Sequence, residues 1–254
     1  MIFDSTGSNI IYTNLQNGQV REFNLSAKTD TPLASGFVNT ADLALEPGGA
    51  TTLVSDFQGG TISRINLATH AVTTLGNYGG NPQGLAYDAH GNLLAVLGTR
   101  SGGATSFVAR LDPITGAILG QTVGEIQLDG LTFDPFTGLL YSPSTSGNGI
   151  FAIDPSTLAV TLLNNSTGVA FDGITTDSNG NLFIANFEGN RIEQYNLISD
   201  VLTPETIVPG LDDLAPASGL GAPPVPEPSS LALLAVGLMG LAGHALRRRD
   251  RMPL

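Results

Sequence analysis

Short apolar runs separated by polar turns recur at a nearly constant spacing along the first 217 residues of the chain. One series of runs includes residues 62–65, 108–111 and 150–153, and each run is followed by an Asn or an Asp. The residues that follow the runs of this series lie 42, 46, 42 and 42 positions apart. They are Asn24, Asn66, Asp112, Asp154 and Asn196.

Two further registers repeat with the same spacing. Seven residues after each Asn or Asp stands a threonine in four copies and Leu119 in the third copy. About twenty residues before each Asn or Asp stands an acidic residue that opens a turn into another apolar run. Three registers that agree over five copies predict an array of five repeats. The threonines are Thr31, Thr73, Thr161 and Thr203, and the acidic residues are Asp4, Glu46, Asp88, Asp134 and Asp177.

A period of about 42 residues with four short strands per copy is typical of a β-propeller. One four-stranded blade cannot bury both of its faces, so it must stack on neighbouring blades. We therefore expect an all-β propeller of about five four-stranded blades over residues 1–217, and the extra residues of the third copy fall in a loop at 100–105. The strands expected in that copy are residues 84–87, 93–97, 107–111 and 117–123.

The start of the chain aligns with the middle of an inner strand, since residues 1–4 match residues 85–88 and 131–134. An exported protein needs an apolar leader, and none precedes this strand. One interpretation is a truncated start, with one or two blades of a six- or seven-bladed ring upstream. The alternative is a complete five-bladed ring in which residues 212–217 form an inner strand that closes on the first blade.

The pattern changes at the C-terminal end, where an apolar run covers residues 229–246. As a helix, this run rises about 27 Å, close to the roughly 30 Å hydrocarbon core of a bilayer. A buried soluble helix is the alternative, but the run has no polar face apart from His244. A cationic flank stays in the cytoplasm, so the preceding chain is expected outside it. The cationic flank is Arg247, Arg248, Arg249 and Arg251.

Just before the apolar run stand Pro226, Glu227 and Pro228. This tripeptide, the short apolar helix and the arginine-rich end together resemble the PEP-CTERM sorting signal of Gram-negative bacteria. The resemblance implies processing by an exosortase, a transient inner-membrane anchor at 229–246 and a final place in the cell envelope or extracellular matrix. We expect a linker at 218–225 and the sorting signal at 226–254.

Composition supports an exported body. The residues before the sorting signal include 6 basic and 20 acidic side chains, a net charge of about −14. Phosphate groups repel such a surface, so a nucleic acid partner is excluded. The chain has no cysteine, so no disulfide stabilises the fold. The 32 glycines fit short strands joined by tight turns.

Two resemblances extend this interpretation to blade families. Residues 177–197 (DSNGNLFIANFEGNRIEQYNL) resemble the NHL repeat, a blade type of many secreted propellers. Gln83, Asp129 and Asp172 each precede a glycine near the start of an inner strand, and Asp212 occupies the equivalent place in the last copy. This pattern resembles the gluconolactonase and senescence-marker family, in which such residues hold a divalent metal.

The resemblance implies a site for Ca²⁺ or another divalent cation, which prefers oxygen ligands. The alternative is that each Asp-Gly or Gln-Gly pair forms only the turn that precedes a strand. No histidine pair has metal-ligand spacing, and no serine stands in a Gly-x-Ser-x-Gly elbow. The sequence favours a non-enzymatic module that binds an exopolysaccharide or an envelope protein. A divalent-metal lactonase or related hydrolase is the alternative.

Overall fold

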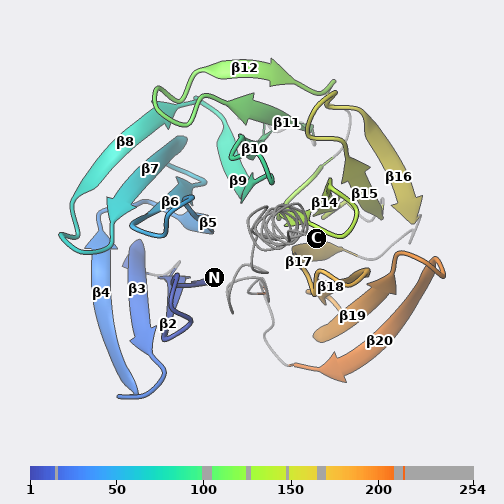
Figure 1. Cartoon of the computed structure of the whole chain (residues 1–254), viewed down its shortest axis with the longest axis horizontal. Helices are drawn as coiled ribbons and strands as arrows, with labels where there is room; N and C mark the ends of the chain where they lie inside the picture. Colours follow the sequence, from blue (N-terminus) through green and yellow to red (C-terminus); the bar gives the residue numbers. More distant parts are fainter. Residues whose placement is uncertain are drawn as a thin grey trace, which may run out of the picture. The chain divides into compact units, whose positions relative to one another are not determined.

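The computed structural model describes residues 1–14, 17–98, 105–123, 127–146, 149–164, 170–208 and 214. Met1–Leu220 form one compact unit. The described part folds into five four-stranded antiparallel sheets placed around a common centre (Figure 1). The predicted all-β propeller with five blades is thereby confirmed.

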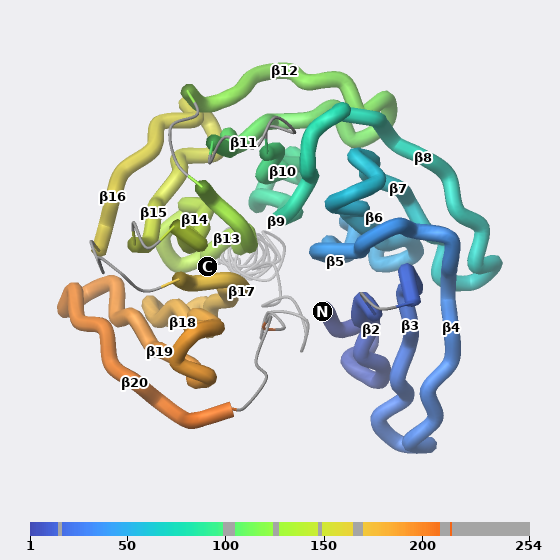
Figure 2. The backbone as a smooth tube through the Cα atoms, turned by 180° about the vertical axis from the view of Figure 1, so that it is seen from behind, coloured from blue at the N-terminus to red at the C-terminus, as the bar shows by residue number. Residues whose placement is uncertain are grey.

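Each sheet is one blade, and its strands follow the chain from the centre outward, as the tube in Figure 2 shows. The first blade contains β1 (Ile2–Phe3), β2 (Asn9–Asn14), β3 (Gln19–Asn24) and β4 (Thr29–Ser35). The second contains β5 (Thr40–Leu45), β6 (Thr51–Asp56), β7 (Thr61–Asn66) and β8 (Val72–Asn77). The third contains β9 (Asn81–Tyr87), β10 (Leu93–Gly98), β11 (Ser106–Leu111) and β12 (Ile118–Gln121). The fourth contains β13 (Thr132–Asp134), β14 (Leu139–Pro143), β15 (Ile150–Ile153) and β16 (Val160–Asn164). The fifth contains β17 (Phe171–Thr176), β18 (Asn181–Asn186), β19 (Arg191–Asn196) and β20 (Val201–Ile207).

The strand bounds differ from the sequence expectation mainly at the inner strand of the third blade. β9 begins at Asn81 rather than at residue 84, because Asn81 and Pro82 pair with Gly98 and Leu97 of β10. A register shift in β10 separates these pairs from the regular ladder that follows. β12 is shorter than expected. The register shift between β9 and β10 is a β-bulge. Such a bulge adds a residue to one strand without a hydrophobic signal in the sequence.

The repeated Asn or Asp is explained by the turn between the third and fourth strand of each blade. Its side-chain oxygen accepts hydrogen bonds from the backbone N–H groups two and three residues later in all five blades. The residue four positions later has a positive φ in every copy. Only a few residue types favour such a turn, which is why its register is visible in the sequence. The positive-φ residues are Lys28, His70, Gly116, Leu158 and Asp200.

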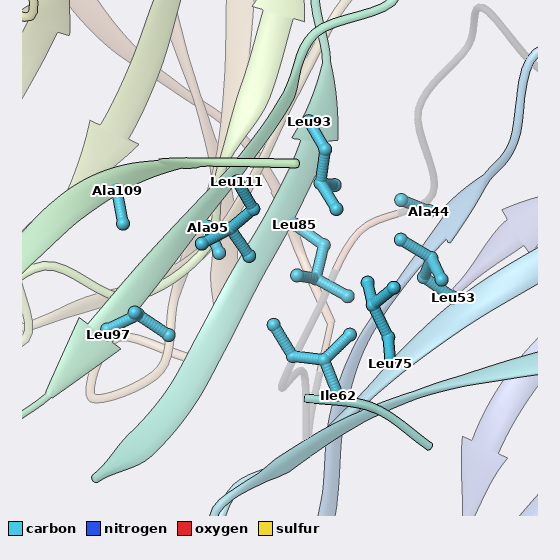
Figure 3. Packing of buried hydrophobic residues seen from close by; sticks show 10 residues of the cluster. All are labelled: Ala44, Leu53, Ile62, Leu75, Leu85, Leu93, Ala95, Leu97, Ala109 and Leu111. Atoms are coloured by element: carbon cyan, nitrogen blue, oxygen red, sulfur yellow. The ribbon is translucent and has the colours of Figure 1, made fainter. Parts of the chain in front are cut away.

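The hydrophobic core lies between blades. Figure 3 shows the cluster between the second and third blades, where Leu53 and Leu75 lie close to Leu85. Similar clusters join the first blade to the second, the third to the fourth and the fourth to the fifth. Each cluster removes one blade face from water, and this burial drives the stacking. The described residues thus contain four inter-blade cores for five blades.

The first blade has no such core on its other face within the described chain. Ile10 and Phe23 occupy the places that Leu93 and Leu111 occupy in the third blade. Leu93 and Leu111 are buried against the second blade, whereas Ile10 and Phe23 keep part of their surface exposed. Among the described residues, the first blade therefore shares a buried core with the second blade and with no other.

No described segment forms a helix with the length and apolar character needed to cross a membrane. The expected linker at 218–225, the sorting signal at 226–254 with its helix at 229–246, and Asp212 lie outside the described residues. The division of the chain at these positions stays a prediction.

Candidate functional site

The starts of the inner strands β5, β9, β13 and β17 meet near the centre of the propeller (Figure 2). A cavity of about 200 Å³ lies there, which we call the inner-strand pocket. It contains half-buried carboxylate and amide side chains from four successive blades, together with one aromatic ring. Its lining is Asn39, Ala41, Asp42, Phe57, Gln83, Gly84, Asp129, Gly130, Asp172 and Gly173.

The structure brings three of the four predicted site residues into this one pocket. Gln83, Asp129 and Asp172 line it from the third, fourth and fifth blades. Asp212 lies outside the described residues. Sequence register alone thus located the side chains that share the pocket, whereas their role as metal ligands stays a prediction.

The glycines beside these residues allow the inner strands to approach one another. A Cβ atom added to Gly84 would lie 2.5 Å from the backbone oxygen of Asp129, and one on Gly130 would lie 3.2 Å from that of Asp172. The N–H of Gly84 donates to the Asp129 oxygen over 3.1 Å. Gln83 and Gly84 lie inside β9, so a turn before the strand does not explain this pair. The glycines serve close packing of backbone on backbone.

Asp42 is a pocket residue that the sequence analysis missed. It stands in the register of Gly84, and its Oδ2 accepts the backbone N–H of Leu85 in the next blade over 2.8 Å. Its Oδ1 accepts the N–H of Leu43 over 2.7 Å. The carboxylate therefore bridges two inner strands. Alignment of the repeats could have shown it, because an acidic residue replaces the glycine only in this copy among those with a described inner strand.

Asn39 and Phe57 complete the pocket from the second blade. The Asn39 side-chain Oδ1 is buried and has no hydrogen-bond partner within the described chain. The backbone N–H of Phe57 donates to the backbone oxygen of Asn39 over 2.7 Å, which holds the two residues side by side. A buried amide oxygen without a partner costs free energy.

The described residues contain no group of three His, Cys, Asp or Glu side chains close enough to hold a metal ion. Both oxygens of Asp42 already accept backbone hydrogen bonds. A calcium ion takes six to eight oxygen ligands, which include backbone carbonyls, amide side chains and waters as well as carboxylates.

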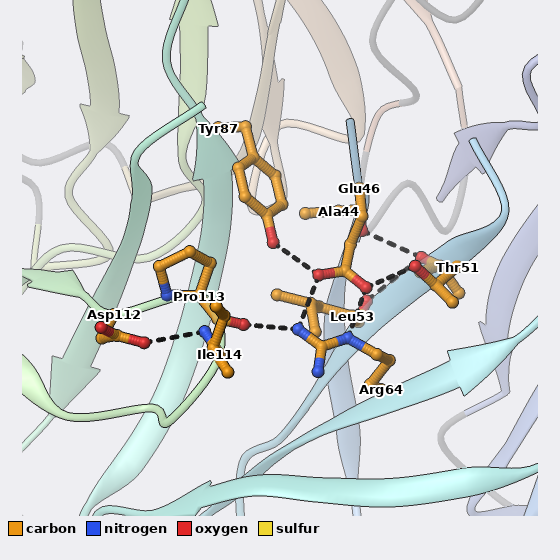
Figure 4. Close-up of polar contacts among 10 residues, drawn as sticks. Ala44, Glu46, Thr51, Leu53, Arg64, Tyr87, Asp112, Pro113 and Ile114 are labelled. Carbon is orange, nitrogen blue, oxygen red and sulfur yellow. Dashed lines mark hydrogen bonds and ion pairs between the residues drawn. The ribbon is translucent and has the colours of Figure 1, made fainter. Parts of the chain in front are cut away.

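A second polar cluster lies between the second and third blades (Figure 4). Its centre is Glu46, whose two oxygens accept hydrogen bonds from Arg64 over 2.5 and 2.8 Å. Thr51 and Tyr87 also donate to this carboxylate, over 2.5 and 2.9 Å. Arg64 donates onward to the backbone oxygen of Pro113 in the third blade over 2.5 Å. Through Tyr87 and Pro113 the cluster joins the second blade to the third.

Electrostatics agree with a structural role for this cluster. Burial raises the pKa of Glu46, but the hydrogen bonds from Arg64, Thr51 and Tyr87 outweigh burial and hold that pKa below its usual range. Burial and the Glu46 carboxylate raise the pKa of Tyr87. Glu46 is therefore a stable anion, not a proton donor near neutral pH.

The contact of Arg64 is repeated one blade further along. Arg110 occupies the same register and donates to the backbone oxygens of Pro155 and Ser156 in the fourth blade. Pro155 stands in the same place of its turn as Pro113. These guanidinium groups join consecutive blades at the outer turns.

The remaining candidates for catalysis are held in structural contacts. The Ser55 hydroxyl donates to the backbone oxygen of Gln83, and the Ser142 hydroxyl donates to that of Gly130, both over 2.7 Å. His70 occupies the positive-φ position of its turn.

Comparison with known proteins identifies the C-terminal signal and the fold. Residues 224–249 match the PEP-CTERM protein-sorting motif, which confirms the sorting signal inferred from the sequence. The motif implies processing by an exosortase and export across a membrane. No curated protein sequence matches the chain significantly.

Solved propeller structures resemble the chain at low sequence identity. A nidogen/laminin complex chain has a TM-score of 0.72 at 19% identity, with 84% of this chain and 82% of that chain covered. A calcium-binding regucalcin from Agrobacterium tumefaciens str. C58 gives 0.70 at 17%, with 84% and 76% covered. Virginiamycin B lyase from Staphylococcus aureus gives 0.63 at 18%, with 86% and 73% covered. These likenesses show the propeller fold and not a shared activity.

Proposed function

We propose that this exported propeller is a binding module of the cell envelope or extracellular matrix, without chemistry of its own. Its ligand is a polyhydroxylated unit, such as a sugar residue of an exopolysaccharide, held in the inner-strand pocket. The observation that carries this proposal is the convergence of Gln83, Asp129 and Asp172 with Asn39 and Phe57 around one cavity.

The chemistry of the lining supports a sugar. Sugar hydroxyl groups donate hydrogen bonds, and carboxylate and amide oxygens accept them. The apolar C–H face of a sugar ring packs on an aromatic ring, which Phe57 offers. A cavity of about 200 Å³ has room for a single sugar unit rather than a folded partner.

The charge of the pocket restricts the kind of sugar. Asp42, Asp129 and Asp172 all line it, and the body as a whole carries about −14. Like charges repel in such a site, so acidic sugars such as uronic acids are disfavoured. Neutral sugars and amino sugars are the expected ligands.

The alternative function is that of a divalent-metal lactonase or related hydrolase. Two observations support it: the pocket holds two aspartates and a glutamine in the predicted register, and a calcium-binding regucalcin shares the fold. In that case Asp129 and Asp172 would hold the ion together with Gln83 and with Asp212.

Thermal unfolding with added ligands separates the two functions. A bound ligand raises the melting temperature by mass action. We expect neutral or amino oligosaccharides to raise it, Phe57→Ala to abolish the rise, and Ca²⁺ to have no effect. A rise with Ca²⁺ in the wild type that disappears in Asp129→Asn with Asp172→Asn, without any response to sugars, would support the hydrolase instead.

Asp154→Asn is the matched control for these aspartate variants. Asp154 accepts hydrogen bonds in an outer turn, where Asn24, Asn66 and Asn196 have the same role. Removing this charge therefore leaves both the turn and the pocket intact. If the rise in melting temperature with ligand also disappears in Asp154→Asn, the rise depends on net charge and not on the inner-strand pocket.

A further inference from the structure

An exposed phenylalanine lies beside the inner-strand pocket on the fifth blade. Phe187 is 56% exposed and stands in the turn between β18 and β19. The residue before it, Asn186, pairs with Phe171 at the start of β17. Asp172 follows Phe171 and lines the inner-strand pocket. The turn that carries Phe187 is therefore at the pocket end of the fifth blade, next to the strand that contributes Asp172.

The second blade contains an equivalent turn. Phe57 and Phe187 each stand nine positions before the repeated Asn of their blade. In both blades, the residue before the phenylalanine pairs with the start of the inner strand. Its side-chain oxygen accepts the N–H of a glycine three residues later, over 3.1 Å from Asp56 and 2.7 Å from Asn186. The two aromatic rings thus occupy equivalent places on their blades.

The turn itself does not require an aromatic residue. The same register contains Leu15 in the first copy and Thr145 in the fourth. Phe57 lines the inner-strand pocket, where the proposed function has it pack against a sugar ring. Phe187 has more than half of its surface in water, so it contributes little to the core of its blade. A ligand that covers this ring would account for an aromatic residue here.

A buried polar network supports the turn that carries Phe187. The Asn186 side chain is buried, and its Nδ2 donates to Oε1 of the buried Glu193 over 2.6 Å. The Nε of Arg191 donates to the same oxygen over 2.8 Å. In the second blade, Ser63 stands in the register of Glu193. A network of this kind rigidifies the residues that it joins, and a rigid group loses little conformational entropy when it binds a ligand.

Polar groups surround the ring of Phe187. Glu188 and Asn190 are exposed in the same turn, and the Arg191 side chain that follows is 41% exposed. A sugar unit has an apolar C–H face and a rim of hydroxyl groups, so it requires an aromatic ring with donors and acceptors beside it. A single ring among polar groups is too small for a stable protein interface.

We propose that Phe187 forms a second sugar subsite, so that the ligand is a chain of several sugar units. The inference rests on the proposed function, because the inner-strand pocket holds the first unit. The sugar chain leaves the pocket past Asp172 and places a further unit on the ring of Phe187. Two subsites that bind one chain give a higher affinity than either alone, since the second contact is intramolecular.

A series of oligosaccharides of increasing length tests this proposal on the full chain. The protein is purified in a detergent without a sugar headgroup. The probes are cellulose-derived oligomers of one to six glucose units and chitosan-derived oligomers of one to six glucosamine units. In titration calorimetry, we expect the hexamer of the series that binds to bind about tenfold more tightly than the single sugar. Phe187→Ala should lose most of this gain.

Phe136→Ala is the matched control. Phe136 is 55% exposed and follows the end of β13, whereas the pocket residue Asp129 precedes the start of that strand. This variant should keep the gain in affinity with length, and circular dichroism checks the fold of both variants.

Two results would overturn the second subsite while the proposed function stands. One is an equal affinity of the wild type for the single sugar and the hexamer. The other is a gain with length that Phe187→Ala retains as fully as Phe136→Ala does. If no sugar of either series binds the wild type, the proposed function and the second subsite are both overturned.

Discussion

The Arg64→Ala variant tests the polar cluster that joins the second blade to the third. The substitution removes the two hydrogen bonds to the Glu46 carboxylate and the one to the Pro113 backbone oxygen. Thr51 and Tyr87 still donate to Glu46, so the carboxylate keeps some of its partners. The negative charge of Glu46 nevertheless loses its counter-ion at a site where its side chain is only 10% exposed.

The magnitude follows from the burial of this pair. Removing one partner of a fully buried ion pair costs about 3–5 kcal/mol. The Arg64 side chain is 28% exposed, so water screens part of the loss. We therefore expect the free energy of unfolding to fall by about 2–3 kcal/mol. Arg21→Ala is the control, because its partner Asp30 is 39% exposed and water screens such surface pairs, so they contribute little to stability.

The pH dependence gives an independent check. The pKa of Glu46 is lowered in the folded state, so the unfolded chain binds protons more readily. The stabilisation by Glu46 is therefore fully present above its ordinary pKa of 4.5 and is lost as the pH falls through the lower folded pKa. Arg64→Ala should weaken this dependence.

Urea unfolding of residues 1–220, followed by circular dichroism, measures both effects. The chain has no tryptophan, so fluorescence is less suitable. A loss for Arg64→Ala no larger than that for Arg21→Ala would refute the reasoning. The reasoning would also be refuted if the free energy of unfolding of Arg64→Ala fell as much as that of the wild type between neutral and acidic pH.

Three further predictions concern the turns, the ends of the blade array and the sorting signal. Lys28→Gly should stabilise the fold by up to about 1 kcal/mol in urea unfolding, because Lys28 is exposed and has a φ of 55°. Gly116→Ala, at the same place of the third blade, should destabilise it by more than about 1 kcal/mol, since the new Cβ would lie 2.5 Å from the Leu75 oxygen. Amide exchange should be fastest in the first and last blades, each of which shares one described inter-blade core, and uniform exchange would contradict this. Glu227→Ala should leave full-length protein in the inner membrane, whereas neutral residues at 247–249 should cause mislocalisation. Mass spectrometry of envelope protein from a host with an exosortase distinguishes these outcomes, and normal processing of Glu227→Ala would contradict the first.

The fold could be predicted because its repeated turns depend on local chemistry. The Oδ1 of Asn66 satisfies two N–H groups within three residues, and His70 then takes a positive φ. Such short-range requirements restrict residue type at fixed positions and so remain visible in the sequence. The number of blades and the nature of the fold follow from them.

The contacts between blades were less accessible. Glu46 accepts a hydrogen bond from Tyr87 of the next blade, 41 positions away, and nothing in the repeat of Glu46 indicates this partner. Asp42 was missed because the glycine register was interpreted as turn chemistry, whereas Gly84 and Gly130 serve close backbone packing. Long-range partners become apparent only when neighbouring repeats are placed side by side.

The arginine contacts between blades have a direction. Arg64 and Arg110 both donate to a blade that lies later in the chain. The carbonyl partners lie 49 and 46 residues further along the chain. Each guanidinium therefore gains its partner only when the following blade is in place. A partly folded array leaves the arginine of its last blade without that carbonyl, so these contacts favour the addition of the next blade in the C-terminal direction.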